Sequence, residues 1–358
     1  MQLLLFLLST MTVLSSCGRQ NISPEANHVM NGPLSAIAVG DTVNGTGNNI
    51  MTVYQDKKNN YWFGSWQDGL YKYDGKTILH FTTKNGLPHH RVEDIQEDQW
   101  GNLYFNTSEG LCTFDGQNFR TLHAKESAEW KLEPGDLWFK SLQFEGSVYR
   151  YDGKELHRLQ LPESQLGKDW ISKHPASANS YGVYTIYKDS KGNIWFGTAA
   201  LGACRYNGQS FDWISEEDVT ELHDGPSNGV RSIIEDKDGR FWFNSAYRYE
   251  VYGKSKVNKQ TFYNREKSIG NLDGSPDSDF WEYLSIARDN NNELWIATYR
   301  NGVWRYDGKR TTYYPVRADG KDITLFYIYK DNKGGLWLGT HENGAYTFNG
   351  RSFERFKP

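Results

Sequence analysis

The sequence has little cysteine, proline and methionine, and it has no long run of one charge. It contains 3 cysteines, 10 prolines and 4 methionines in 358 residues. These low counts exclude a disulfide-stapled scaffold and a proline-rich disordered chain. No basic run exceeds two residues, and the formal net charge is −4. A nucleic-acid-binding domain usually carries a basic stripe, so we expect no nucleic acid among the partners.

Helical periodicity and metal-binding motifs are also missing. No long window repeats apolar residues at the spacing of an amphipathic helix. The sequence has no H-E-x-x-H and no C-x-x-C motif, and its 9 histidines are not clustered at ligand spacing. We therefore expect neither a metal ion nor a cofactor.

The chain does contain a phrase that recurs seven times. It reads D-x-x-G-x-hydrophobic-Trp-hydrophobic, followed by G-x-aromatic-x-aromatic-Asp/Asn-Gly. A repeat of this length predicts an array of small, similar units. The clear copies are residues 56–75, 98–116, 189–208, 289–308 and 331–350, with a weaker copy at 236–253 and a truncated copy at 136–153.

One copy predicts four short antiparallel strands. Residues 183–189 alternate in polarity and lead into a tight turn at 190–192. Residues 194–198 are aromatic and β-branched, which favours a second strand. Residues 203–206 form the third strand, and the Asn-Gly pair at 207–208 indicates a hairpin to a fourth strand at 210–214.

Such a sheet buries its faces only by stacking on similar sheets. We therefore predict an all-β fold, a seven-bladed β-propeller of four-stranded antiparallel blades, over residues 50–358. The repeated Trp and Asp residues are expected to be core and turn residues, because a site needs different groups meeting at one point. The Trp-equivalent positions, on average about 46 residues apart, are Trp62, Tyr104, Trp138, Trp195, Trp242, Trp295 and Trp337.

The N-terminus has the pattern of an export signal. Residues 1–16 are apolar but too short for a spanning helix, and Leu14-Ser15-Ser16-Cys17 resembles the bacterial lipobox. We expect residues 1–16 to be a lipoprotein signal peptide, Cys17 to carry the lipid, and residues 17–49 to be a flexible tether. A strand at 35–39 would be able to join a blade edge. The alternative is an ordinary signal peptide that leaves Cys17 unmodified.

The two remaining cysteines are predicted to be buried free thiols. Cys112 and Cys204 occupy the same core position of the third strand in blades that are not neighbours. A disulfide needs Cα atoms within about 7 Å, so we expect none.

The phrases at 189–198, 302–308 and 331–340 resemble the two-component regulator propeller repeat, and the resemblance covers residues 50–356. In that family the propellers resemble extracytoplasmic sensor domains of hybrid histidine kinases in Bacteroidota, where they sense oligosaccharides. This chain ends at Pro358 without a transmembrane segment, an immunoglobulin-like domain or a kinase. We therefore expect a stand-alone lipoprotein of a Gram-negative envelope, in the outer membrane and facing the periplasm.

A ligand is expected on one face, here called the top face. It carries the loops between second and third strands and the connections between blades, and these vary greatly in length. Aromatic rings stack on sugars, and Arg binds carboxylate or sulfate groups. The predicted ligand-binding residues are Trp66, Gln67, Arg91, Tyr181, Arg231, Tyr247, Arg248, Trp281, Tyr299, Arg300, Phe326 and His341.

Three functions remain open from the sequence. We expect non-catalytic recognition of an oligosaccharide or other small ligand, in sensing or uptake, with a separate membrane signalling or envelope protein as partner. The first alternative is a lyase, in which His341 acts with Tyr299 or Tyr247 while Arg300 or Arg248 stabilises the developing charge. The second is a protein-binding envelope scaffold.

Overall fold

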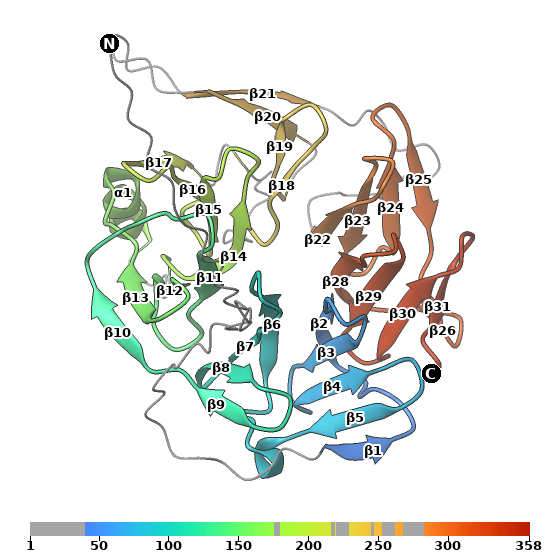
Figure 1. Cartoon of the computed structure of the whole chain (residues 1–358). Helices are drawn as coiled ribbons and strands as arrows, with labels where there is room; N and C mark the ends of the chain where they lie inside the picture. The colour runs from blue at the N-terminus through green and yellow to red at the C-terminus, as the bar shows by residue number, and fades with distance from the viewer. Residues whose placement is uncertain are drawn as a thin grey trace, which may run out of the picture. The chain divides into compact units, whose positions relative to one another are not determined.

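The described strands form the predicted seven-bladed β-propeller (Figure 1). The computed structural model describes residues 40–174, 180–215, 219, 229–244, 247–252, 262–267 and 283–358. Six blades are sheets of four strands and one has five, while β26 (Arg317–Ala318) and β27 (Lys321–Asp322) form a small separate hairpin.

In blades 1 to 4 the strands are ordered as follows from the centre of the ring outward. Blade 1 has β2 (Ile50–Gln55), β3 (Tyr61–Ser65), β4 (Leu70–Tyr73), β5 (Ile78–Phe81) and β1 (Asp41–Val43); blade 2 has β6 (Val92–Glu97), β7 (Leu103–Thr107), β8 (Gly110–Phe114) and β9 (Phe119–Thr121); blade 3 has β11 (Leu137–Lys140), β12 (Ser147–Tyr151), β13 (Leu156–Gln160) and β10 (Ala124–Ser127); blade 4 has β14 (Val183–Lys188), β15 (Ile194–Thr198), β16 (Ala203–Tyr206) and β17 (Phe211–Ile214).

Blades 5 to 7 keep the same order, and two short helices lie in the connections of the first half. Blade 5 has β18 (Ile234–Glu235), β19 (Phe241–Trp242), β20 (Tyr247–Val251) and β21 (Tyr263–Lys267); blade 6 has β22 (Tyr283–Arg288), β23 (Leu294–Thr298), β24 (Val303–Tyr306) and β25 (Thr311–Tyr314); blade 7 has β28 (Leu325–Lys330), β29 (Leu336–Thr340), β30 (Ala345–Phe348) and β31 (Phe353–Arg355); the helices are η1 (Thr83–Asn85) and α1 (Gln165–Lys173).

In five of the seven blades, the repeated Asp holds a turn and a neighbouring indole at the same time. In blade 4, Asp189 Oδ1 accepts hydrogen bonds from the amides of Lys191 and Asn193, and its Oδ2 accepts one from Trp195 Nε1 at 2.9 Å. The Trp is fully buried, so this bond satisfies a donor that would otherwise be costly. The same indole–carboxylate pair recurs as Trp62–Asp56, Trp242–Asp236, Trp295–Asp289 and Trp337–Asp331.

Glycine lets neighbouring blades approach closely. A Cβ added at Gly197 of β15 would lie 2.3 Å from the carbonyl oxygen of Val230 in the next blade. Equivalent approaches occur at Gly64 and Gly339. These repeated glycines are therefore packing requirements, and the blades pack through backbone as well as side chains.

Blade 3 departs from the repeat. Its first strand along the chain lies on the outer edge of the sheet, whereas in the other blades the first strand of the repeat is the innermost one. The segment before β11 does not form an innermost strand there; it forms β10, which pairs in parallel with β13 on the outer edge. The residues of β10 are Ala, Lys, Glu and Ser, and three of the four are exposed. Such a polar segment suits an outer edge and not the centre of the ring. In Figure 1 β10 runs along the outside of this blade, and β11 is its innermost strand.

Among the described strands, none is shared between the two ends of the chain, and the ring closes there by packing. β31 completes blade 7 from the C-terminal segment alone, as predicted. Phe356 then packs against Trp337 of blade 7 and against Phe63 and Tyr73 of blade 1, with ring centroids 5.1–5.7 Å apart.

The N-terminal part of the propeller begins earlier than the predicted boundary at residue 50. Asp41–Val43 falls in the expected tether, but here it is β1, paired antiparallel with β5. The segment that follows is also attached, since Asn48 accepts a bond from the Gly344 amide at 2.6 Å. The expected strand at 35–39, Cys17 and the signal peptide lie outside the described residues.

The predicted state of the two other cysteines is confirmed. Cys112 and Cys204 are both buried free thiols. Burial raises the pKa of both thiols, so neither is activated as a nucleophile.

Candidate functional site: the cavities around blade 3

The displaced strand leaves a cavity at each end of β11. At the top face, the upper cavity has a volume of about 340 Å³ and is bordered by the ends of β6, β11 and β14. At the opposite face, the lower cavity has a volume of about 530 Å³ and is bordered by Trp138, Ile186 and Lys188. Both volumes fall in the range of small-molecule sites.

A buried carboxylate lies between two cations in the upper cavity. Glu93, whose side chain is 5% exposed, is ion-paired with Arg91 and, at 2.7 Å, with Lys140 Nζ. Burial raises the pKa of Glu93, but the charges and hydrogen bonds of Lys140 and Arg91 outweigh it, so the pKa lies below its ordinary value. Glu93 is therefore ionised at neutral pH, and the three groups together carry one net positive charge.

Aromatic rings flank these cations. The Arg91 guanidinium lies 3.5 Å from the ring centroid of Trp66, which is 38% exposed. Across the cavity, Tyr184 lines the wall and carries the Arg231 guanidinium 4.3 Å from its ring centroid. Arg91 Nε is buried and has no hydrogen-bond acceptor in the described part of the chain. The cavity therefore combines flat apolar surface with donors.

Two amide side chains protect the open edge of β11. The Ser141 amide donates to the Ser147 carbonyl of β12, so the backbone groups of Trp138 and Lys140 face the other way, toward the gap. Gln96 Nε2 donates to the Trp138 carbonyl at 2.7 Å, and Asn106 Nδ2 donates to the Lys140 carbonyl at 2.9 Å. The neighbouring blade therefore satisfies the carbonyls that a first strand would pair with, and the cavities stay open.

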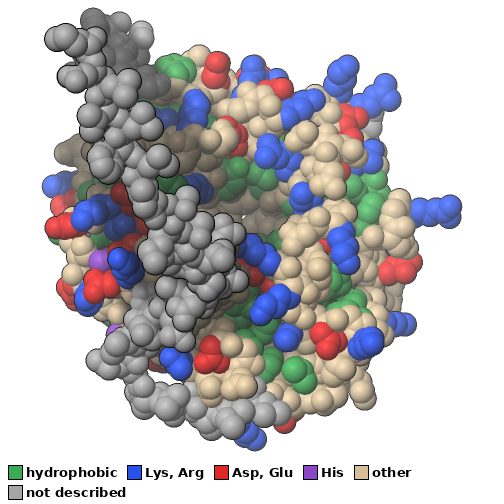
Figure 2. Space-filling model, viewed as in Figure 1, with side chains coloured by type: hydrophobic (Ala, Val, Ile, Leu, Met, Phe, Trp, Pro, Cys, Tyr) green, Lys and Arg blue, Asp and Glu red, His purple; other side chains and the backbone are tan. Residues whose placement is uncertain are grey.

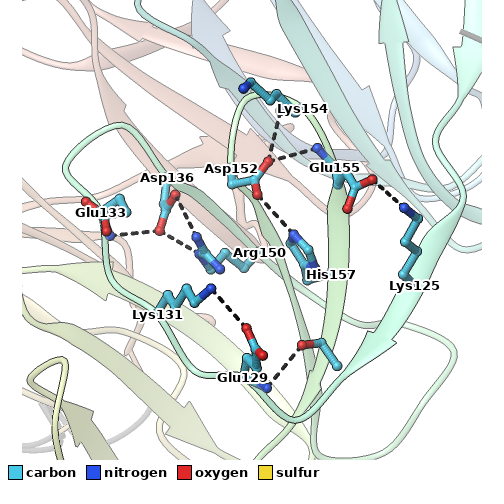
Figure 3. Close-up of polar contacts among 11 residues, drawn as sticks. Lys125, Glu129, Lys131, Glu133, Asp136, Arg150, Asp152, Lys154, Glu155 and His157 are labelled. Atoms are coloured by element: carbon cyan, nitrogen blue, oxygen red, sulfur yellow. Dashed lines mark hydrogen bonds and ion pairs between the residues drawn. The ribbon is translucent and has the colours of Figure 1, made fainter. Parts of the chain in front are cut away.

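The lower end of blade 3 is rearranged as well (Figure 3). Asp136 does not bind an indole; it pairs with Arg150, with Oδ2 2.6 Å from Arg150 Nε, and accepts a bond from the Glu133 amide. Trp138 Nε1 is consequently buried without a partner among the described residues. Figure 3 also shows the ion pair between Lys131 and Glu129 beside them.

A third cavity lies on the outer side of the same blade. This outer cavity has a volume of about 560 Å³ and is bordered by β10, by Arg158 and Gln160 of β13, and by residues 143–145. The same three residues border the upper cavity. Residues 141–146, here called the blade 3 loop, therefore form a common wall between the two cavities.

The predicted site residues separate into two groups. Arg91 lines the upper cavity, and Trp66 and Arg231 stack on its lining residues Arg91 and Tyr184. Tyr299, Phe326 and His341 form a second group over blades 6 and 7, in which the Phe326 ring lies 6.5 Å from Tyr299 and 5.1 Å from His341. In this second group, the Arg300 guanidinium lies 5.3 Å from the ring centroid of Tyr299.

The other predicted residues have different surroundings. The Tyr181 hydroxyl accepts a bond from the Ser164 amide at the start of α1, and the Gln67 amide donates to Ser65 Oγ. Tyr247 and Arg248 were predicted in a loop, but they lie in β20, where Arg248 is ion-paired with Glu266. Trp281 lies outside the described residues.

Sequence reasoning missed Glu93, Lys140, Tyr184 and Phe144. For one of them, Lys140, the sequence does contain an indication. Lys140 stands two residues after Trp138, where Gly64, Gly197 and Gly339 follow their own Trp residues. A long charged side chain cannot occupy such a close blade contact, so this position indicated that blade 3 is different.

The described residues offer no metal centre. No group of three or more His, Cys, Asp or Glu side chains among them has metal-ligand geometry. No helix in the described ranges is long and apolar enough to cross a membrane. Acidic and basic side chains are interspersed on the face shown in Figure 2.

Comparisons with known proteins agree with the repeat. Residues 44–67, 177–200 and 224–247 match the family model described as two component regulator propeller. A stretch of 159 residues, 44% of the chain, is 27% identical to Histidine kinase P4 of Formosa agariphila. The chain covers only 10% of that relative.

Solved structures share the fold at low identity. The extracellular domain assigned to a one-component system of B. thetaiotaomicron matches with a TM-score of 0.56 and 18% identity, over 87% of this chain and 40% of that one. Virginiamycin B lyase from Staphylococcus aureus matches with a TM-score of 0.58 and 15% identity, over 86% and 97%. The chain is thus a propeller in which three segments match the two-component regulator repeat, and its fold is similar to those of this extracellular domain and of the lyase.

Proposed function

We propose that the protein is a non-catalytic ligand-binding propeller that recognises an oligosaccharide in the upper cavity of blade 3. The observation that carries the proposal is the displacement of β10, which opens the cavity beside Arg91, Glu93 and Lys140. Trp66 and Tyr184 offer apolar ring surface for a sugar, and the cations offer donors for its oxygens.

The relatives support a sensory setting for this binding. Two of the comparisons above are with a histidine kinase and with the extracellular domain of a regulatory system. We propose that the chain serves such a system, or glycan uptake, outside the cytoplasm, and that Cys17 anchors it to the outer membrane of a Gram-negative cell. A separate membrane protein would then transmit the signal.

Binding without catalysis fits the second group of predicted residues. The His341 side chain is 42% exposed, and its Nδ1 lies 3.3 Å from Glu342 Oε1. Phe326 places an apolar ring beside both His341 and Tyr299, where the lyase hypothesis needs polar groups that converge on a substrate.

A thermal-shift screen of the full chain against neutral and acidic oligosaccharides tests this function. A ligand at 100 times its dissociation constant stabilises the fold by about 2.7 kcal/mol, so a clear rise in the unfolding midpoint is expected. Trp66→Ala should reduce that rise. Trp100→Ala, which changes an exposed Trp on the opposite face, should leave it unchanged. If no oligosaccharide shifts the midpoint, the proposed function is wrong, and unsaturated products would indicate a lyase instead.

A further inference from the structure

The upper and outer cavities lie on the two sides of the blade 3 loop, and the line that joins them across this loop is here called the path. Gln143, Phe144 and Glu145 of the blade 3 loop border both cavities. The path runs from Arg91 and Lys140 near the centre of the ring to Arg158 and Gln160 at its outer side. A path with a cavity at each end suits a chain-like ligand better than a single compact one.

The two ends of the path differ in charge. At the inner end, Glu93 neutralises only one of Arg91 and Lys140, and Arg91 Nε still lacks an acceptor among the described residues. At the outer end, Arg158 is balanced by its ion pair with Glu126. Glu145 lies on the exposed loop between them, where solvent screens its charge. An anionic group is therefore favoured at the inner end alone.

The outer end has the features of a neutral sugar site. Phe144 is 44% exposed, although the Arg158 guanidinium lies 3.8 Å from its ring centroid. Gln160 is held in place, because its Oε1 accepts from Ser147 Oγ at 2.8 Å and its Nε2 donates to the Glu145 carbonyl. An exposed ring beside fixed amide and guanidinium groups is suited to the apolar face and hydroxyls of a sugar.

We propose that the ligand is an oligosaccharide with an anionic sugar at one end, bound across the blade 3 loop. The carboxylate or sulfate of that sugar lies against Arg91 and Lys140, and a neutral sugar further along the chain stacks on Phe144 in the outer cavity. This inference rests on the proposed function, and it adds a second subsite, a chain direction and a minimum ligand length.

Calorimetric titration of the full chain with a length series of uronic-acid-terminated oligosaccharides tests the inference. The affinity should rise at the length that reaches the outer cavity, and Phe144→Ala should remove that gain, roughly tenfold, so that a long ligand loses more affinity than the shortest one. Tyr252→Ala, which changes another exposed ring outside the path, serves as the matched control and should change nothing.

Two results would overturn the inference while leaving the proposed function intact. One is an affinity that does not depend on ligand length. The other is an equal loss for short and long ligands in Phe144→Ala. If oligosaccharides of every length fail to bind, the proposed function itself is wrong, and the second subsite falls with it.

Discussion

At the scale of single residues, the repeated Asp–Trp pair links the sequence to the fold. The sequence predicted both residues correctly as turn and core, because their spacing recurs in every clear copy. It did not reveal that the same carboxylate holds the turn amides and the indole N–H, as Asp189 does. That bond requires the three-dimensional approach of strand and turn.

Trp195→Phe should destabilise the protein by about 1–2 kcal/mol more than Trp138→Phe. The first change removes a buried bond to a carboxylate, worth about 1.5–3 kcal/mol, whereas Trp138 Nε1 has no partner among the described residues to lose. Both changes remove similar ring volume. Urea denaturation measures the two free energies of unfolding, and equal losses would contradict the role assigned to the bond.

Adjacent acidic residues should affect stability with opposite pH dependence. The pKa of Glu93 lies below its ordinary value of 4.5, whereas burial raises the pKa of Asp94 above 3.8. Glu93 therefore stabilises the fold above about pH 4.5, and this contribution is lost as the pH falls. Asp94 acts in the other direction, because its ionisation costs stability as the pH rises above 3.8.

Glu93→Gln should accordingly cost most stability near neutral pH and progressively less below about pH 4.5. Asp94→Asn should become more favourable relative to the unmodified protein as the pH rises. Free energies of unfolding at several pH values measure both trends. If the effects of both substitutions on the free energy of unfolding changed with pH in the same direction, the charges around Lys140 would be arranged differently.

At the scale of elements, the sequence predicted the regular blades well and blade 3 poorly. The strands 194–198 and 203–206 were predicted with their observed bounds. In blade 3 the copy lacked its leading D-x-x-G turn, and the preceding residues had no alternating apolar pattern. This absence was readable, but the new position of the segment was not, since pairing with β13 depends on contacts distant in sequence.

A pair of engineered cysteines tests the position of β10. Lys125 lies opposite His157 in the parallel β10–β13 pair, so Lys125→Cys with His157→Cys should form a disulfide on oxidation. Lys125→Cys with Lys140→Cys, which joins the inner edge of the blade, should stay reduced. Mass spectrometry of the linked peptides distinguishes the two, and cross-linking of the second pair would mean that the segment fills the centre.

At the scale of the whole molecule, composition and repeat number were sufficient for the propeller but not for the closure of its ring. The sequence left open whether the ends share a strand. Phe356 decides the matter, because it comes from the C-terminal segment and packs on Phe63 and Tyr73 of blade 1.

Phe356→Ala should therefore destabilise the entire ring. A half-buried phenylalanine that bridges two blades should cost about 2 kcal/mol on truncation, below the 3–5 kcal/mol of a fully buried one. Lys357→Ala, at the next and exposed position, should stay within about 0.5 kcal/mol of the unmodified protein. Thermal unfolding of both variants measures the difference, and a neutral Phe356→Ala would mean that the ring closes by other contacts.

The candidate site was only partly predictable at this scale. Loop variability pointed to the top face, and Trp66 and Arg91, which the sequence proposed as ligand-binding residues, lie stacked on each other beside the upper cavity. Their meeting with Lys140 and Tyr184 depends on which strands surround the gap, and no local pattern specifies that. The sequence assigned Tyr299 and His341 to the same ligand site as Trp66 and Arg91. In the structure these residues form two separate groups, so the ligand site has two candidate positions.

A calorimetric titration that compares two arginines tests the central claim most directly. With an acidic oligosaccharide as titrant, Arg91→Gln should weaken binding at least tenfold, since a hydrogen bond to a charged group is worth about 1.5–3 kcal/mol. Arg300→Gln, in the group over blades 6 and 7, should bind as the unmodified protein does. The opposite result, with binding lost in Arg300→Gln and kept in Arg91→Gln, would contradict a site in blade 3.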